Sequence, residues 1–94
     1  MGYYTDYELS YVAATPELRK LVEKYIKERP NIDYAVNEQE PTKWYSWEKD
    51  MAEMSDCFPS IIFILEGHGE EYDDIWRATC KNGRVEAKKA TISF

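Results

Sequence analysis

The longest uninterrupted apolar stretch of this chain is Ile61–Leu65, with the sequence IIFIL. Its branched side chains favour a β-strand, and the absence of a polar position predicts a central strand covered on both faces, or nearly so. The run is far shorter than the ~20 residues needed to span a bilayer. The rest of the chain must therefore form layers around a sheet, and its 94 residues suffice for a single domain spanning residues 1–94.

Two elements are expected before Pro30. Tyr3–Ala13 alternates aromatic and polar positions with a period of two, which is typical of a half-buried strand. Thr15 and Pro16 fit the N-cap and the first turn of a helix, and an apolar stripe at helical spacing follows them. Pro30 disfavours helical geometry at the residue before it, so we expect this helix to end there.

The middle of the chain predicts a short strand and a second helix. Ile32–Val36 (IDYAV) is interpreted as the strand. After the polar segment Asn37–Lys43, Ser46 is expected to cap a helix that Pro59 ends.

Glycines and a hairpin signal divide the C-terminal part. Gly67–Gly69 (GHG) is expected to break the apolar strand, and two further strands are expected over Ile75–Cys80 and Arg84–Phe94. Asn82–Gly83 between them is a strong signal for a tight hairpin. The expected order is β-α-β-α-β-β-β, an α+β fold with two helices on one face of a mostly antiparallel sheet, which is a variant of the ferredoxin-like sandwich.

The charge balance restricts the classes of partner. Eighteen acidic and 12 basic residues give a net charge of −6, and such a chain is repelled by nucleic acid and by anionic membranes. We expect a basic protein partner instead. The N-terminus has the features of neither a secretory signal nor a myristoylation site, and the two cysteines, Cys57 and Cys80, are expected to be reduced thiols in the cytoplasm.

A cluster of five acids lies within nine residues around the glycines. Four interpretations are open: a solvated loop, a patch that recognises a basic partner, a loop that binds a divalent metal, and acid–base catalysis by His68 with a carboxylate. The spacing does not match a calcium loop, and neither a nucleophile nor a pocket can be named. The acids are Glu66, Glu70, Glu71, Asp73 and Asp74.

Aromatic residues at the start of the second helix are candidate interface anchors. Trp44, Tyr45 and Trp47 cannot all face one core, and exposed Trp and Tyr side chains are typical anchors of interfaces. The alternative is that Trp44 and Trp47 cover the edge of the core while Tyr45 points to solvent. Tyr72, inside the acidic cluster, is a further candidate anchor.

Basic residues gather on the C-terminal hairpin, opposite in sign to the acidic cluster. They could pair with a partner or with a second copy of the chain, or simply keep an edge strand soluble. They are Lys81, Arg84, Lys88 and Lys89, with Glu86 as the single acid.

The chain from Thr42 onward resembles a group of small acidic proteins of phages, prophages and mobile elements. The resemblance rests on Thr42–Met51 (TKWYSWEKDM), on Phe58–Phe63 (FPSIIF), on Leu65–Glu71 (LEGHGEE) and on Asp74-Ile75-Trp76, followed by Lys81–Arg84 (KNGR). The resemblance implies no catalytic residues for this chain. The resemblance implies, by analogy, an inhibitor of a host defence nuclease or effector, of the anti-CRISPR or anti-restriction type.

These observations favour a non-enzymatic protein-binding module without a cofactor or metal, acting as a monomer or weak homodimer. The expected partner is the basic surface of a host protein, such as an effector that binds nucleic acid, and the expected contacts are the five acids with Trp44, Tyr45 and Tyr72. The first alternative is a small metal-dependent or acid–base enzyme centred on His68. The second alternative is an assembly component that uses a sheet edge or the basic hairpin.

Overall fold

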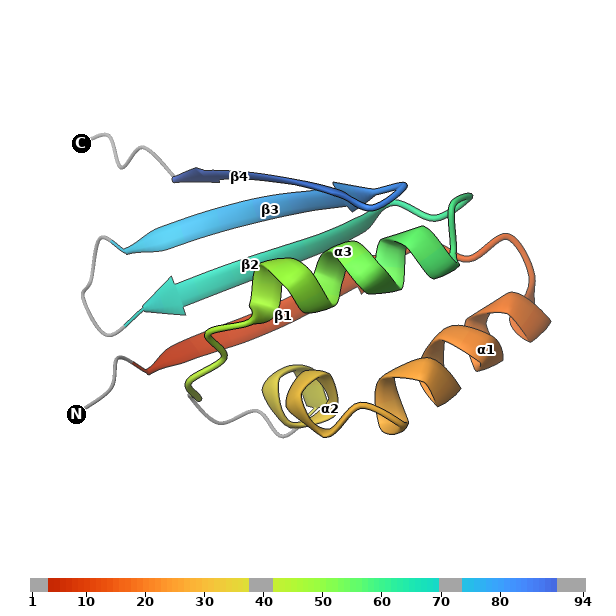
Figure 1. Ribbon diagram of the computed structural model, residues 1–94, viewed down its shortest axis with the longest axis horizontal. Helices are drawn as coiled ribbons and strands as arrows, with labels where there is room; N and C mark the ends of the chain where they lie inside the picture. The colour runs from red at the N-terminus through yellow and green to blue at the C-terminus, as the bar shows by residue number, and fades with distance from the viewer. Residues whose placement is uncertain (1–3, 38–41, 70–73, 90–94) are drawn as a thin grey trace.

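The structure, a computed structural model, describes residues 4–37, 42–69 and 74–89. These residues form an α+β fold with a four-stranded antiparallel sheet in the order β1-β2-β3-β4 and three helices (Figure 1). None of the described helices is long and apolar enough to cross a membrane. The elements are β1 (Thr5–Tyr11), α1 (Pro16–Lys27), α2 (Pro30–Asn37), α3 (Trp47–Cys57), β2 (Phe63–Gly69), β3 (Ile75–Lys81) and β4 (Arg84–Lys89).

Helix α1 begins as its sequence predicts. The Leu18 backbone N–H donates to Thr15 Oγ1 at 3.1 Å, and Pro16 occupies the first turn, where a missing amide hydrogen costs nothing. Val22 and Ile26 bury the apolar stripe in the core. The helix stops just before Pro30, which confirms the predicted end.

The segment Ile32–Val36 is helical, so the strand expected there was wrong. Pro30 does not only end α1; it also opens α2, because proline fits the first position of a helix. Ile32 and Ala35, three residues apart, are the buried positions of α2. The observed order is therefore β-α-α-α-β-β-β, and the ferredoxin-like arrangement, which rested on the expected order, is not confirmed.

The glycines after the apolar run continue β2 instead of breaking it. Gly67 lies opposite Tyr7 of β1 and Trp76 of β3. A Cβ atom at Gly67 would lie 2.2 Å from Trp76 Cε2, so the missing side chain makes room for the indole. Trp76 in turn stacks on Trp47 of α3, with ring centroids 4.5 Å apart.

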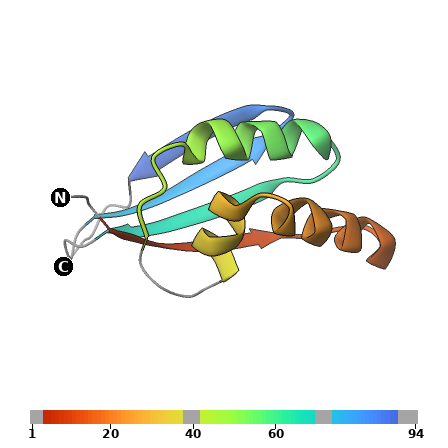
Figure 2. The same cartoon turned by 60° about the horizontal axis from the view of Figure 1, so that its bottom comes forward.

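All three helices lie on one side of the sheet (Figures 1 and 2). Ile61, Phe63 and Leu65 are buried beneath them, whereas Ile62 is 47% exposed and Ile64 is half-buried. The run IIFIL is therefore covered on one face only, contrary to the expectation of cover on both. The buried core residues are Val22, Ile26, Ile32, Ala35, Trp44, Met51, Met54, Ile61, Phe63, Leu65, Ala78 and Cys80.

The predicted hairpin joins β3 to β4 and is tied to α3. Asn82 and Gly83 have φ angles of 51° and 78°, the left-handed geometry that Asn-Gly turns adopt. The Gly83 N–H donates to Ser55 Oγ at 2.9 Å, and the same hydroxyl donates to the Ala52 carbonyl at 2.9 Å. Ser55 therefore anchors the hairpin to the helix from a fully buried position.

Substitution of Ser55 by alanine is expected to cost about 1–2 kcal/mol, because it removes two hydrogen bonds and leaves the Gly83 N–H without its acceptor. Urea unfolding followed by circular dichroism measures this loss. The exposed Ser10 is the control, and Ser10→Ala is expected to change stability by less than about 0.5 kcal/mol. Equal stability of the two variants would show that the Ser55 anchor contributes nothing.

The two cysteines are free thiols in different surroundings, since Cys57 is exposed and Cys80 is fully buried. Burial raises the pKa of the Cys80 thiol to about 11, so it stays protonated at neutral pH. Because the thiolate is the reactive form, we expect a disulfide reagent at about pH 8 to modify Cys57 and to reach Cys80 only after unfolding. A Cys57→Ala variant should lose the fast reaction, and two equally fast thiols would contradict the packing of Cys80.

Candidate functional site

The sheet face opposite the helices is uncovered in the described part of the chain (Figure 2). We call it the open face. Every second residue of each strand lies on it, because strand side chains alternate between the two faces. Its members are Asp6, Glu8 and Ser10 of β1, Ile64, Glu66 and His68 of β2, Ile75, Arg77, Thr79 and Lys81 of β3, and Arg84, Glu86 and Lys88 of β4.

Charge changes sign across the open face. The strand register places Glu8, Glu66, Arg77 and Lys88 side by side in one row from β1 to β4. At the centre of the row, Arg77 Nε donates to Glu66 Oε1 at 2.9 Å, and Arg77 Nη2 contacts the same oxygen. The row is therefore acidic on β1, neutralised in the middle and basic on β4.

The carboxylates of Asp6 and Glu8 are the free negative charges on the β1 side of this face, and we call this pair the acidic edge. Both side chains are exposed, and neither makes an ion pair or a hydrogen bond with another described residue. Glu8 lies directly opposite Glu66, and like charges in cross-strand pairs destabilise a sheet. Arg77 neutralises the charge of Glu66, whereas Glu8 has no cationic partner among the described residues.

The acids predicted from the glycine-rich cluster behave differently from the acidic edge. Glu66 pairs with Arg77, and Asp74 Oδ1 lies 3.6 Å from Lys89 Nζ. The charge of each is compensated within the chain, so neither acid is an unpaired carboxylate of the expected acidic patch. The reason is that β2 runs on through the glycines and pairs with β3, whose Arg77 faces Glu66. The remaining predicted residues of the cluster, Glu70, Glu71, Tyr72 and Asp73, lie outside the described residues.

The predicted aromatic anchors separate into one core residue and one surface residue. Trp44 is only 4% exposed, packs edge-to-face on Tyr7 with centroids 5.2 Å apart, and donates from Nε1 to Asp50 Oδ2 at 2.7 Å. It is therefore part of the core and no surface anchor, which corrects that expectation. Tyr45 is 77% exposed and stays available for contact. Trp47 is half-buried, as the alternative interpretation expected.

The enzyme alternative finds no assembled site in the described ranges. His68 is exposed on the open face, between Asp6 and Ile75 in the register. Among residues 4–37, 42–69 and 74–89, no three His, Cys, Asp or Glu side chains are grouped so that they could hold a metal ion.

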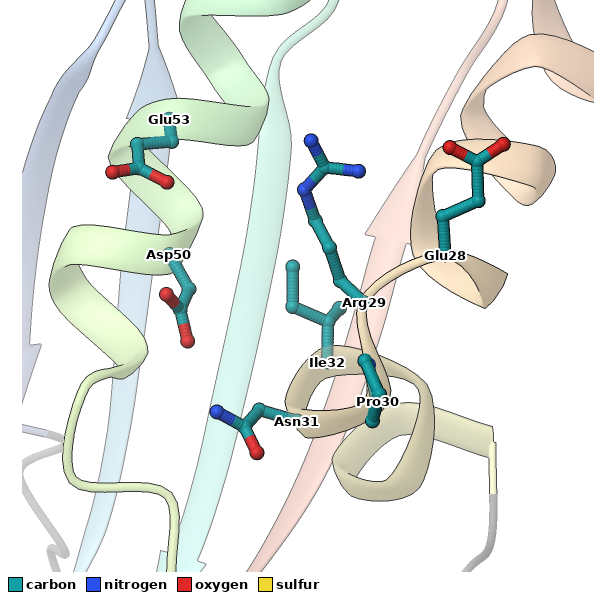
Figure 3. A pocket seen from close by; sticks show the side chains of 7 residues that line it. All are labelled: Glu28, Arg29, Pro30, Asn31, Ile32, Asp50 and Glu53. Atoms are coloured by element: carbon teal, nitrogen blue, oxygen red, sulfur yellow. The ribbon is translucent and has the colours of Figure 1, made fainter.

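A small hollow lies on the helix side, where the α1–α2 junction faces α3 (Figure 3). Its volume is about 190 Å³, below the roughly 300 Å³ at which ligand pockets begin. Arg29 lines it, with its guanidinium 3.5 Å from the Tyr25 ring centroid, and Arg29 Nη1 donates to the Tyr25 carbonyl at 3.3 Å. Asp50 on the facing helix already accepts from Trp44 and Ser46. These polar groups serve the chain's own packing.

Asp6 and Glu8 lie on the polar side of the predicted first strand but are not among the site residues predicted from the sequence. The signal that could have found them is the alternation over Tyr3–Ala13, which already placed both acids on one face. The alternation alone does not show that this face of the sheet stays uncovered.

Comparisons of the chain with protein-family models, with curated proteins and with solved structures found no match.

Proposed function

We propose that the chain is a non-enzymatic protein-binding module whose acidic edge contacts a basic surface of another protein. The observation that carries this proposal is Glu8, an exposed carboxylate that lies opposite the like-charged Glu66 and has no cation among the described residues. A Lys or Arg side chain of a partner would supply Glu8 with the cation that Arg77 supplies to Glu66. The partner therefore gains an attraction that the isolated chain cannot supply.

The net charge of −6 supports the same class of partner. Long-range attraction accelerates the encounter with a basic protein and disfavours nucleic acid as a direct ligand. Tyr45 supplies an exposed aromatic ring for the rim of such a contact. Glu70, Glu71, Tyr72 and Asp73 remain in the proposal as partner contacts on the strength of the sequence alone.

The finer proposal concerns the partner's identity. The resemblance to small phage proteins favours the nucleic-acid-binding surface of a host defence nuclease or effector, which is basic because it must hold phosphates. A chain that occupies this surface competes with nucleic acid for the same Lys and Arg side chains. The proposed outcome is inhibition without catalysis, in the cytoplasm of the host.

The test is affinity capture from a bacterial lysate with three immobilised forms of the chain. The first is wild type, and the second is Asp6→Asn/Glu8→Gln, which neutralises the acidic edge. The third is Glu48→Gln/Glu53→Gln, which changes the net charge equally but on the exposed surface of α3. Each capture is run at ~50 mM and ~500 mM salt, because screening weakens contacts between exposed charges.

The expected result is a protein retained by wild type and by the α3 variant at low salt, released at high salt and lost with the acidic-edge variant. Melting temperatures of the three forms should agree within a few degrees, since surface substitutions change stability little. Equal retention by all three forms, or equal loss from both variants, would contradict the proposed surface.

A further inference from the structure

Strand β4 forms an outer border of the sheet, since β3 is its only neighbour in the described residues. In Figure 1 strand β4 lies along the upper margin of the molecule, and the three helices are all drawn below it. The residues that flank a two-residue turn form a hydrogen-bonded pair, and this bonding alternates along an antiparallel ladder. The backbone N–H and C=O groups of Val85, Ala87 and Lys89 therefore face outward, available to another strand.

The open-face side chains of β4 carry an alternating charge pattern. They are Arg84, Glu86 and Lys88 in sequence, and all three are exposed. None of them makes an ion pair with another described residue, although Glu66 and Arg77 of the neighbouring strands do pair. Charged side chains, Lys above all, usually protect an edge strand from pairing, but the charges of this edge have both signs, so a strand with the complementary order of charges can pair with it.

We propose that β4 pairs antiparallel with β4 of a second copy of this chain, so that two four-stranded sheets join into one. In an antiparallel pair, two residues that lie opposite each other have their side chains on the same face of the sheet. The two-fold axis of a symmetric pair must therefore pass through a residue of β4 that lies opposite its own copy, and not between two residues. With the axis at Ala87, Glu86 of each copy lies opposite Lys88 of the other, and both cross-strand pairs are attractive. With the axis at Glu86, the two Glu86 side chains lie opposite each other and Arg84 lies opposite Lys88. All of these pairs are repulsive.

The Ala87 axis also suits the backbone and the other face. Ala87 then forms the central hydrogen-bonded pair with its own copy, and Val85 and Lys89 form the outer ones. The small Ala87 side chains meet on the helix side without crowding, and the long apolar stem of Lys89 covers the half-buried Val85. An axis at Val85 also gives attractive pairs, because Arg84 then lies opposite Glu86. The two strands overlap over fewer residues in that register than with the axis at Ala87, so we favour the Ala87 axis.

Sedimentation equilibrium of the full chain at concentrations up to about 1 mM tests the pairing, since weak interfaces dissociate in the micromolar range and above. We expect a monomer–dimer equilibrium for wild type. Glu86→Lys makes the open-face charges of β4 uniformly positive and should weaken the dimer roughly tenfold or more. Glu53→Lys, on α3, makes the same change in net charge and should leave the dimer unchanged.

The charge swap Glu86→Lys/Lys88→Glu tests the register, because it recreates the attractive pairs only for an axis at Ala87. It should restore wild-type dimerisation. In a Cys57→Ser background, Ala87→Cys should then cross-link two copies under mild oxidation, since hydrogen-bonded pairs have Cα atoms ~5.5 Å apart, within disulfide range. Val85→Cys should not cross-link.

Three results would overturn the proposal: a wild-type monomer at the highest concentration, a dimer that Glu86→Lys leaves intact, or cross-linking through Val85 and not Ala87. The test is independent of the proposed function, because the acidic edge lies on β1, at the opposite border of the sheet. Loss of dimerisation with retained partner capture, or the reverse, would separate the two.

Discussion

Gly67→Ala is expected to destabilise the protein by about 3 kcal/mol, the upper end of the range for overpacking a filled core. The added methyl group would lie 2.2 Å from Trp76 Cε2 and 2.3 Å from Trp76 Cζ2, closer than any real contact. The indole cannot simply move away, because Trp47 stacks on it at 4.5 Å and Tyr7 packs against it at 6.0 Å. The strain therefore spreads through the aromatic cluster that joins α3 to the sheet.

A double-mutant cycle with Trp76→Leu measures this contact directly. Thermal unfolding of Gly67→Ala should show a melting temperature lower by about 12 °C or more. In the Trp76→Leu background the same methyl group should cost little, which gives a coupling energy above about 1 kcal/mol. If the two substitutions were additive, Gly67 would matter for its backbone alone and the close approach of Trp76 would be wrong.

Phe63→Ala is the second large effect, with an expected loss of about 3–5 kcal/mol. Phe63 is fully buried on the helix side of β2, with ring centroids 5.3 Å from Tyr11 and 6.3 Å from Phe58. Truncation leaves a cavity between the sheet and the segment that follows α3. A domain of this size has only about 5–15 kcal/mol in total, so the variant should be partly unfolded at 37 °C.

The neighbouring residue is the matched control for that cavity. Ile62 is 47% exposed and adjoins Phe63 in the chain, so Ile62→Ala should cost below about 1 kcal/mol. Guanidinium unfolding of both variants gives the comparison. Similar losses at the two positions would contradict the one-sided cover of the IIFIL run.

The sequence predicted correctly those elements that depend on residues close to one another in the chain. The N-cap at Thr15 and the Asn82–Gly83 turn depend on bonds and φ angles within a few residues, and the structure confirms both. The alternation of the first strand correctly separates its faces, with Tyr7 half-buried and Asp6 and Glu8 exposed. Such elements are readable because neighbouring residues alone favour them.

The helix α2 could not be predicted in this way. IDYAV is too short for its apolar spacing to distinguish a period of two from a period of 3.6. Ile32 and Val36 are apolar in both patterns, and Ala35 decides the outcome by being buried in the core. The decision came from packing against the rest of the chain, which overrides local propensity.

The behaviour of the glycines and acids depends on contacts distant in the sequence. Gly67 is needed because Trp76, nine positions later in the chain, covers it. Glu66 is neutralised because the register places Arg77 opposite it. The sequence indicates a surplus of acids, but only the register shows that Asp6 and Glu8 are the carboxylates left free among the described open-face acids of β1 and β2.

Amide chemical-shift mapping tests whether the acidic edge of β1 is the surface that contacts the partner. The ¹⁵N-labelled chain is titrated with the protein identified by capture, and perturbed amides are assigned to faces of the fold. We expect the changes to centre on Asp6 and Glu8 of β1 and to extend to Glu66 of β2. Changes centred instead on α1, α2 and α3, with the β1 amides unmoved, would contradict it.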